Sequence, residues 1–175
     1  MSSVEQDRPG LVVWLTGLPS SGKSTLAMRL KTRLCGAGKT AIVLDGDDVR
    51  AALRPTPGYD DASRDQFYET LAELAALLAR QGFCVVVPAT AHRRAYRTRA
   101  RNIAPAFLEI WVDTPLAECA RRDDKGLYAR SRSQGTTTLP GADLVYEPPL
   151  EGADSLRVEP DDPIEPLLSR ILDRI

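Results

Sequence analysis

This chain of 175 residues has few of the two most versatile metal-binding residue types. It contains one histidine and three cysteines. One histidine argues against a histidine-based metal centre and against a catalytic triad. Cys35, Cys84 and Cys119 lie far apart, are odd in number and form no C-x-x-C pair. Each stands in an apolar or helical context, which favours buried free thiols over metal ligands.

The sequence also lacks an excess of charge of either sign and any long apolar run. Its 23 Lys and Arg residues against 24 Asp and Glu residues give a net charge of −1, and hence no global electrostatic reason to bind nucleic acid. No stretch approaches the length of a membrane span, and residues 1–10 are polar without the apolar core of a signal peptide. We therefore expect a cytoplasmic protein that binds neither membrane nor nucleic acid. We expect one domain over 1–175, with a flexible N-terminus in 1–10.

Apolar runs typical of buried strands alternate with segments of helical periodicity. This alternation predicts an α/β fold in which helices cover both faces of a parallel sheet. In the longest helical segment we expect one apolar face made of Leu71, Leu74, Leu77 and Leu78. The strands are expected at 11–15, 40–44, 83–87, 107–112 and 155–158, and the helices at 26–34, 66–80, 93–103, 115–122 and 163–175.

Residues 17–24 have the spacing G-x-x-x-x-G-K-S of a phosphate-binding loop. Its glycines let the backbone curl so that several N–H groups face one anion, while Lys23 would reach the β- and γ-phosphates of a nucleotide and Ser24 would hold Mg²⁺. The strand before this loop and the helix after it are the context that the motif requires. They disfavour the alternative, a glycine turn without a ligand, and make the expected fold one of the P-loop NTPase type.

Ligands of such sheets bind beyond the carboxyl ends of the strands. Three carboxylates follow the second strand there, and their position suggests Mg²⁺ handling or abstraction of a proton from an acceptor hydroxyl. The alternative is that Asp47 or Asp48 only caps a helix running through Leu53, and we favour Asp47 as a catalytic carboxylate. The crevice is expected to be bordered by 17–24, by 45–48 with Asp45, by 88–92 and by 113–115.

Arginine side chains supply two further candidate anion ligands, Arg50 and Arg64, because a guanidinium matches phosphate or sulfate oxygens in a bidentate way. The alternative for each is a solvated helix face. Arg93, Arg97 and Arg101 share one helical face, which we interpret mostly as solvated or as a partner surface.

Residues 121–132 form a polar segment that is dense in cations. A mobile lid that closes over transferring phosphates needs cations to offset charge and a glycine to hinge, which Gly126 would supply. The composition fits an ordinary basic surface loop equally well.

With these motifs in order, the chain resembles the adenylyl-sulfate kinase family of P-loop kinases. The D-G-D-x-V-R and K-G-L-Y elements are far more specific than the phosphate loop, which many families share. The resemblance runs from about residue 11 to 160 and rests on 17–26, Leu44–Arg50, Gly58-Tyr59, Arg64, Val112–Leu116, Lys125–Tyr128 and Tyr146–Pro149.

The family transfers the γ-phosphoryl group of ATP to the 3′-hydroxyl of adenylyl sulfate with the help of Mg²⁺, and it is commonly dimeric. The resemblance implies that Lys23, Asp47 and Lys125 are catalytic and that Asp47 is the general base. It implies that Arg50 and Arg64 hold the phosphosulfate end, that Tyr59 stacks on the acceptor adenine, and that Lys125 and Leu127 belong to the closing segment. Implied ATP contacts are Gly17, Leu18, Pro19, Ser20, Ser21, Gly22, Lys23, Ser24, Thr25 and Arg122, the last against the ATP base. Implied acceptor contacts are Asp45, Arg50, Tyr59, Arg64, Phe67, Ala89, Thr90, Lys125 and Leu127.

The acceptor side departs from the family pattern at two places. The family's R-x-x-N-I-R here reads Arg64–Glu69, so that Phe67 cannot form a hydrogen bond and Glu69 reverses a charge. The family's I-S-P-Y-R reads Ala89–Arg93, which keeps a hydroxyl at Thr90 but loses the proline. The acceptor is therefore expected to be adenylyl sulfate or another nucleotide-linked or small anionic molecule. A third hypothesis, a regulatory nucleotide-binding protein without transfer activity, is disfavoured because the catalytic residues are present.

Overall fold

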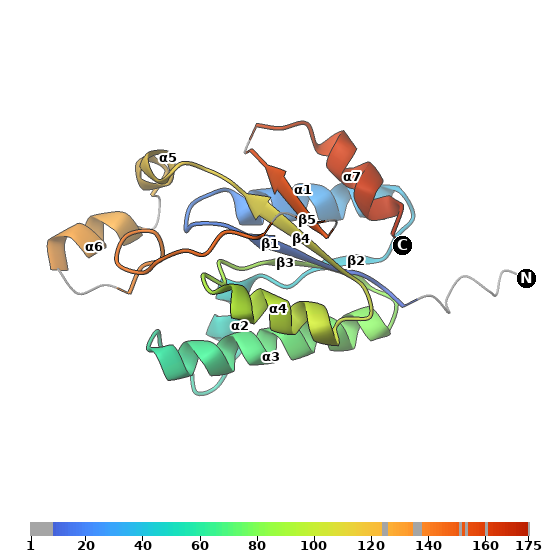
Figure 1. Ribbon diagram of the computed structural model, residues 1–175. Coiled ribbons are helices and arrows are strands. Elements are labelled where there is room, and N and C mark those ends of the chain that lie inside the picture. The colour runs from blue at the N-terminus through green and yellow to red at the C-terminus, as the bar shows by residue number, and fades with distance from the viewer. Residues whose placement is uncertain are drawn as a thin grey trace, which may run out of the picture.

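The computed structural model describes residues 9–123, 126–134, 138–150, 152, 154–159 and 161–174. Its centre is a parallel sheet of five strands in the order β2-β3-β1-β4-β5. In Figure 1, α1 and α7 cover one face of the sheet, and α2, α3 and α4 cover the other. The strands are β1 Val12–Thr16, β2 Ala41–Val43, β3 Cys84–Pro88, β4 Phe107–Val112 and β5 Ser155–Val158. The helices are α1 Lys23–Gly36, α2 Gly46–Ala52, α3 Asp61–Arg80, α4 Arg94–Ile103, α5 Leu116–Arg121, α6 Leu127–Gln134 and α7 Ile164–Leu172. The predicted α/β architecture is thus confirmed.

The unbroken apolar run of β1 follows from its place in the middle of the sheet. Successive side chains of a strand point to opposite faces, so a strand covered on both sides needs apolar residues throughout. Val13 packs with α1 and α7 in one core, whereas Val12 and Trp14 pack with α3 and α4 in the other. The two cores fix β1 and thereby the start of the loop that follows it.

The predicted leucine face of α3 is wrong. Leu77 is 48% exposed and Leu74 and Leu78 are only partly buried, although Leu71 is fully buried. Beyond Leu71, toward its carboxyl end, α3 buries only small residues among those described, which lets this part of the helix lie close to the sheet. They are Ala72, Ala75, Ala76 and Ala79.

The interpretation of the α4 arginines as a solvated face is wrong for Arg97, which is 1% exposed. Its Nε donates to Glu109 of β4 over 2.5 Å, and its Nη2 donates to the carbonyl of Glu147, also over 2.5 Å. Arg101 binds the second oxygen of Glu109 at 2.9 Å. Helical periodicity cannot reveal such a partner, because Glu109 comes from a different element.

Three smaller expectations also fail. Cys35 is exposed, whereas Cys84 and Cys119 are buried as expected. No helix is predicted between residues 123 and 132, whereas α6 begins there at Leu127. The N–H of Gly10, which is buried, donates to the Ala79 carbonyl at 2.7 Å, so the expected flexible N-terminus does not reach this residue.

Within the ranges that the structure describes, no helix combines the length and the apolar character needed to cross a bilayer.

Candidate functional site

A cavity of about 770 Å³ opens at the carboxyl ends of β1 and β3, the ends that point toward α5 and α6 in Figure 1. It brings together most of the predicted site residues from well-separated parts of the chain. Lys125 lies outside the described residues, and Gly17 and Leu18 shape the loop without lining the cavity. The lining includes 19–25, Asp45, Asp47, Arg50, Tyr59, Arg64, Phe67, Tyr68, 88–90, Arg122, Leu127, Arg130 and 138–140.

The predicted border of this crevice is wrong at 113–115, and Asp48 and His92 also do not line the cavity. Residue Thr114 instead supports the phosphate loop, because its hydroxyl donates to the carbonyl of Ser21 at 2.8 Å and is buried. The end of β4 therefore acts as a support for the loop rather than as a wall of the site.

The phosphate loop leaves β1 through a turn that only glycine can form. Gly17 has φ of 150°, and a Cβ on it would lie 2.6 Å from the carbonyl oxygen of Val112. Gly22, with φ of 98°, is the N-cap of α1, so the amino end of a 14-residue helix faces the cavity. Lys23 is 9% exposed, and its Nζ lies 2.6 Å from the carbonyl oxygen of Leu18. A helix amino end and a lysine ammonium group together make a strong anion site.

Ser24 and Asp45 both line the cavity and are joined by a hydrogen bond. The Ser24 hydroxyl donates to Oδ2 of Asp45 at 2.7 Å, and Oδ1 of Asp45 accepts the N–H of Asp47 at 2.9 Å. Asp45 is therefore the cap of α2, and the alternative in which Asp47 or Asp48 provides the cap is wrong. A hydroxyl and a carboxylate are hard oxygen ligands of the kind that Mg²⁺ prefers. Asp47, the second residue of α2, lines the cavity.

Arg50 of α2 and Arg64 of α3 line the same cavity and are 7% and 4% exposed, so neither belongs to a solvated helix face. Arg50 Nη1 donates to the carbonyl of Gly58 at 2.6 Å, and Arg64 Nη2 donates to that of Thr138 at 2.5 Å. Burial lowers the pKa of Arg64 from its ordinary value, and the positive charge of Arg50 acts in the same direction. Two guanidinium groups in one cavity favour an anionic ligand.

Tyr68 is a residue of this site to which the sequence motifs did not point. Its hydroxyl accepts the N–H of Ala91 at 3.0 Å, and burial raises its pKa. Ala91 has φ of 41°, a conformation that side chains other than glycine rarely adopt. The neighbouring Thr90 is fixed as well, because its carbonyl accepts the hydroxyl of Thr16 at 2.7 Å. The sequence signal that could have pointed to this contact is the pair of departures from the family pattern. Tyr68 replaces the isoleucine of R-x-x-N-I-R, and Ala91 replaces the proline of I-S-P-Y-R.

The lid segment is tied to the phosphate loop by Tyr128, which the motifs also left without a role. The carboxylate of Asp123 accepts the N–H groups of Leu127 and Tyr128 at 2.7 and 2.8 Å, and so caps the start of α6. The Tyr128 hydroxyl, on a side chain that is nearly buried, donates to the carbonyl of Pro19 at 3.0 Å. These contacts place Leu127 in the cavity wall.

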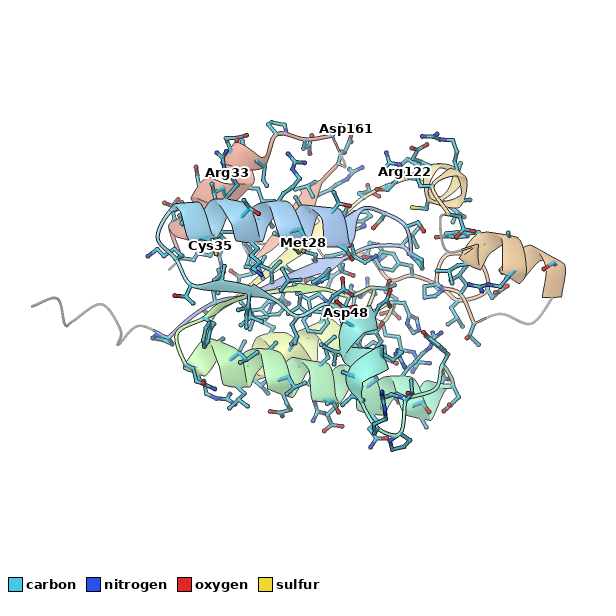
Figure 2. All side chains as sticks on the ribbon, turned by 180° about the vertical axis from the view of Figure 1, so that it is seen from behind. Met28, Arg33, Cys35, Asp48, Arg122 and Asp161 are labelled. Atoms are coloured by element: carbon cyan, nitrogen blue, oxygen red, sulfur yellow. The ribbon has the colours of Figure 1, made fainter. Side chains whose placement is uncertain are left out.

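A second cavity of about 290 Å³ adjoins the first at Gly22, Thr25 and Arg122. Figure 2 labels Arg122 near α5 and Asp161 near the start of α7, two residues that line this second cavity. Arg122 Nε donates to Glu118 at 2.6 Å, and hydrogen bonds from Arg121 and Arg122 lower the pKa of Glu118 to about 2. The guanidinium group of Arg122 is therefore held beside the helix end of the phosphate loop.

A sequence model of the family described as adenylylsulphate kinase matches residues 9–157 of this chain. The adenylyl-sulfate kinase of Pseudomonas aeruginosa is 38% identical over 173 residues, which are 96% of this chain and 88% of that protein. The structure of the Mycobacterium tuberculosis APS kinase CysC in complex with AMPPNP and APS superimposes with a TM-score of 0.84 at 38% identity. That match covers 94% of this chain and 96% of the other.

Some relatives are much longer proteins. The bifunctional enzyme NodQ of Azospirillum brasilense is 42% identical over 160 residues, which are 90% of this chain but 25% of NodQ. The chain thus spans about a quarter of the length of such bifunctional relatives.

Proposed function

The chain belongs to the adenylylsulphate kinase family, and from this premise we propose that it phosphorylates the 3′-hydroxyl of adenylyl sulfate with ATP. The products are 3′-phosphoadenylyl sulfate and ADP. The observation that carries the proposal is that one cavity is lined by a phosphate-binding loop, by two buried arginines and by Asp47. A transfer between two anionic molecules needs these three parts.

ATP binds along the phosphate loop in this proposal. Residues 17–25 surround its phosphates, with Lys23 at the β- and γ-phosphates. Its base enters the smaller cavity and lies against Arg122. The smaller cavity adjoins the larger one at Gly22 and Thr25. The match to a kinase solved with an ATP analogue supports this arrangement.

In the reaction itself, the oxygen of the acceptor hydroxyl forms a bond to the γ-phosphorus as the bond from that phosphorus to the β,γ-bridging oxygen breaks. The proton of the hydroxyl passes to the carboxylate of Asp47, and the bridging oxygen leaves with ADP. Lys23 stabilises the charge on the transferring group. The role of Lys125 in the same step stays a prediction.

Ser24 and Asp45 fit a magnesium ion, since both offer oxygen atoms and lie 2.7 Å apart beside the phosphate loop. When bound, Mg²⁺ neutralises charge on the β- and γ-phosphates. We propose Ser24 as the direct ligand. Asp45 keeps the Ser24 hydroxyl oriented and at the same time caps α2.

The acceptor occupies the end of the cavity at Arg50 and Arg64. These two side chains hold its phosphosulfate group, and Tyr59, which is 59% exposed, closes over its adenine. The remaining wall around the acceptor is formed by Asp45, Phe67, Ala89, Thr90 and Leu127.

The test of this proposal is an incubation of the purified protein with Mg²⁺, ATP and adenylyl sulfate. We expect ADP and the 3′-phosphorylated product in equal amounts, measured by chromatography and phosphorus NMR. An intact, ATP-binding protein that forms no product would reject the proposed acceptor.

Asp47→Asn tests the general base directly. The amide cannot accept the proton, so we expect kcat to fall about 10²- to 10⁴-fold while ATP binding, measured by calorimetry, stays unchanged. Asp48→Asn is the matched control, because Asp48 is the exposed neighbour of the exposed Asp47 in α2 but does not line the cavity. Equal effects of the two substitutions would remove Asp47 from the mechanism.

A second candidate function keeps this chemistry and changes the acceptor to another small anionic molecule. Phe67 is the observation that favours it, since an aromatic ring replaces a hydrogen-bonding side chain in the acceptor wall. Glu69 does not add to this argument, because it pairs with Arg99 outside the cavity. A panel of nucleotide-linked and simple anionic acceptors in an ADP-release assay separates the two candidates. A large preference for adenylyl sulfate would remove the second.

A homodimer, which the family resemblance suggests, stays a prediction. Light scattering on the purified protein would give its molar mass in solution.

A further inference from the structure

Arg50 contacts two aromatic rings in the wall of the cavity. Its guanidinium carbon is 3.8 Å from the ring centroid of Phe67 and 4.5 Å from that of Tyr59. Nη1 of the same group donates to the carbonyls of Pro57 at 3.1 Å and Gly58 at 2.6 Å. The planar group is therefore restrained by two ring contacts and by hydrogen bonds along one edge.

The two rings differ in how firmly they are held. Phe67 is 3% exposed and packs edge-on against Tyr68, with ring centroids 5.2 Å apart. Tyr68 in turn stacks on Tyr96 of α4 at 4.5 Å. Tyr59 is 59% exposed. Phe67 thus provides the fixed surface under Arg50, and Tyr59 provides the outer surface that can move when a ligand enters.

The charge of Arg50 is not cancelled by this environment. In the part of the chain that the structure describes, no carboxylate forms an ion pair with Arg50 or with Arg64. A carboxylate would hold the guanidinium group in place but would also neutralise it toward a ligand. An aromatic face holds the same group by a cation–π contact and leaves its full charge available.

We propose that Phe67 is a positioning residue for the anionic group of the acceptor, acting through Arg50. Its ring fixes the guanidinium plane before the acceptor arrives, so that less conformational entropy is lost on binding. The inference rests on the proposed function, in which Arg50 binds the acceptor. It also accounts for the departure from the family pattern: at this position the chain has exchanged a hydrogen-bonding side chain for a surface that orients a charge.

The kinetic test compares two substitutions of Phe67 with one control. Phe67→Leu keeps an apolar side chain but removes the ring, and we expect KM for the acceptor to rise about tenfold, with kcat and KM for ATP within about twofold. Phe67→Tyr keeps the ring and should restore KM. The control is Phe107→Leu, because Phe107 is also buried under an arginine, Arg101, at 5.1 Å, but at the opposite end of the sheet. If Phe67→Leu and Phe107→Leu changed kcat and KM for the acceptor to the same extent, Phe67 would have a merely structural role and the proposal would be overturned.

NMR of the arginine side chains tests the same proposal without any acceptor. The Nε–Hε signal of Arg50, assigned by its loss in Arg50→Lys, should show a ring-current shift in the wild-type protein, and this shift should largely disappear in Phe67→Leu. An unchanged signal in Phe67→Leu would overturn the proposal, even if KM rises, because Phe67 would then act on the acceptor directly. If the signal changes as expected but the wild-type protein phosphorylates no acceptor, the proposed function fails while the role of Phe67 toward Arg50 stands.

Discussion

His92 is the single histidine of the chain, and it is 3% exposed. Its ring lies edge-on to that of Tyr96, with centroids 5.7 Å apart, and its buried Nδ1 finds no hydrogen-bond partner among the described residues. Burial, helped by the charges of Arg64 and Arg93, lowers the pKa of His92 from 6.5 to about 4. The folded protein therefore holds this residue in its neutral form at physiological pH.

We predict that His92 makes the protein less stable in mild acid. Below pH 6.5 the unfolded chain binds a proton at this residue and the folded chain does not, so the free energy of unfolding falls as the pH decreases from 6.5 to about 4. The loss should reach roughly 2 to 3 kcal/mol relative to His92→Gln, measured by urea unfolding at several pH values. The single histidine ring signal allows its pKa to be read directly by proton NMR. A pKa near 6.5 in the folded protein would contradict the prediction.

The cysteines should differ in reactivity because their surroundings differ. Cys35 is exposed on α1 (Figure 2), whereas burial raises the pKa of Cys84 to about 12 and also raises the pKa of Cys119. We predict that a maleimide modifies one thiol in the native protein and three after denaturation, as counted by mass spectrometry. Cys35→Ser should abolish the native reaction. Fast labelling of that variant would show that one of the buried thiols is accessible.

The contact between Tyr128 and Pro19 joins two elements that are distant in sequence, α6 and the phosphate loop. The hydroxyl group is engaged with the Pro19 carbonyl, so we expect its effect on the reaction to pass through the position of α6. Because Leu127 precedes Tyr128 and lines the cavity, the same contact also sets one wall of the site.

We predict that Tyr128→Phe lowers kcat about three- to tenfold while it lowers the free energy of unfolding by about 1 kcal/mol, the usual value of one hydrogen bond. Amide hydrogen exchange should become faster in α6. Ser133→Ala is the control, since the Ser133 hydroxyl bonds within α6, to the Arg130 carbonyl at 3.1 Å. An unchanged kcat in Tyr128→Phe would mean that the lid position does not depend on this bond.

The elements themselves show where sequence patterns suffice. β4 and β5 have the predicted bounds. β4 is a mostly apolar and mostly buried run, which can be read directly, whereas β5 is only partly buried and alternates polar with apolar residues. The buried face of α3 could not be read in the same way, since alanine at a close helix contact carries no strong apolar signal. The partner of Arg97 was likewise hidden, because Glu109 belongs to a strand that meets α4 only in the folded chain.

The same limit applies to the site. The phosphate loop and the D-G-D-x-V-R element are contiguous in sequence, so their chemistry could be predicted from spacing. The support that Tyr68 gives to Ala91 connects two elements and depends on a backbone conformation that no motif encodes. Tertiary contacts of this kind become visible only when the packing is known.

All five strands belong to one sheet, and both cores share it, so we predict that the whole chain unfolds in one transition. Mg²⁺ and ATP at about 100 times Kd should add about 2.7 kcal/mol and raise Tm by roughly 5 to 10 °C. Differential scanning calorimetry measures both. Lys23→Ala should lose most of the shift because the β- and γ-phosphates lose a cation. Two separate transitions would contradict the prediction of a single domain.

Ala91 limits how this protein can be recombined with its relatives. Proline at this position would need φ near −65° in place of 41°, and it would have no N–H to give to the Tyr68 hydroxyl. An exchange of the loop alone would therefore leave a phenol buried without its donor, whereas an exchange of the loop together with the helix segment around Tyr68 would transplant a matched pair. In chimeras with proline-containing homologues, these two stretches have to be inherited as one cassette.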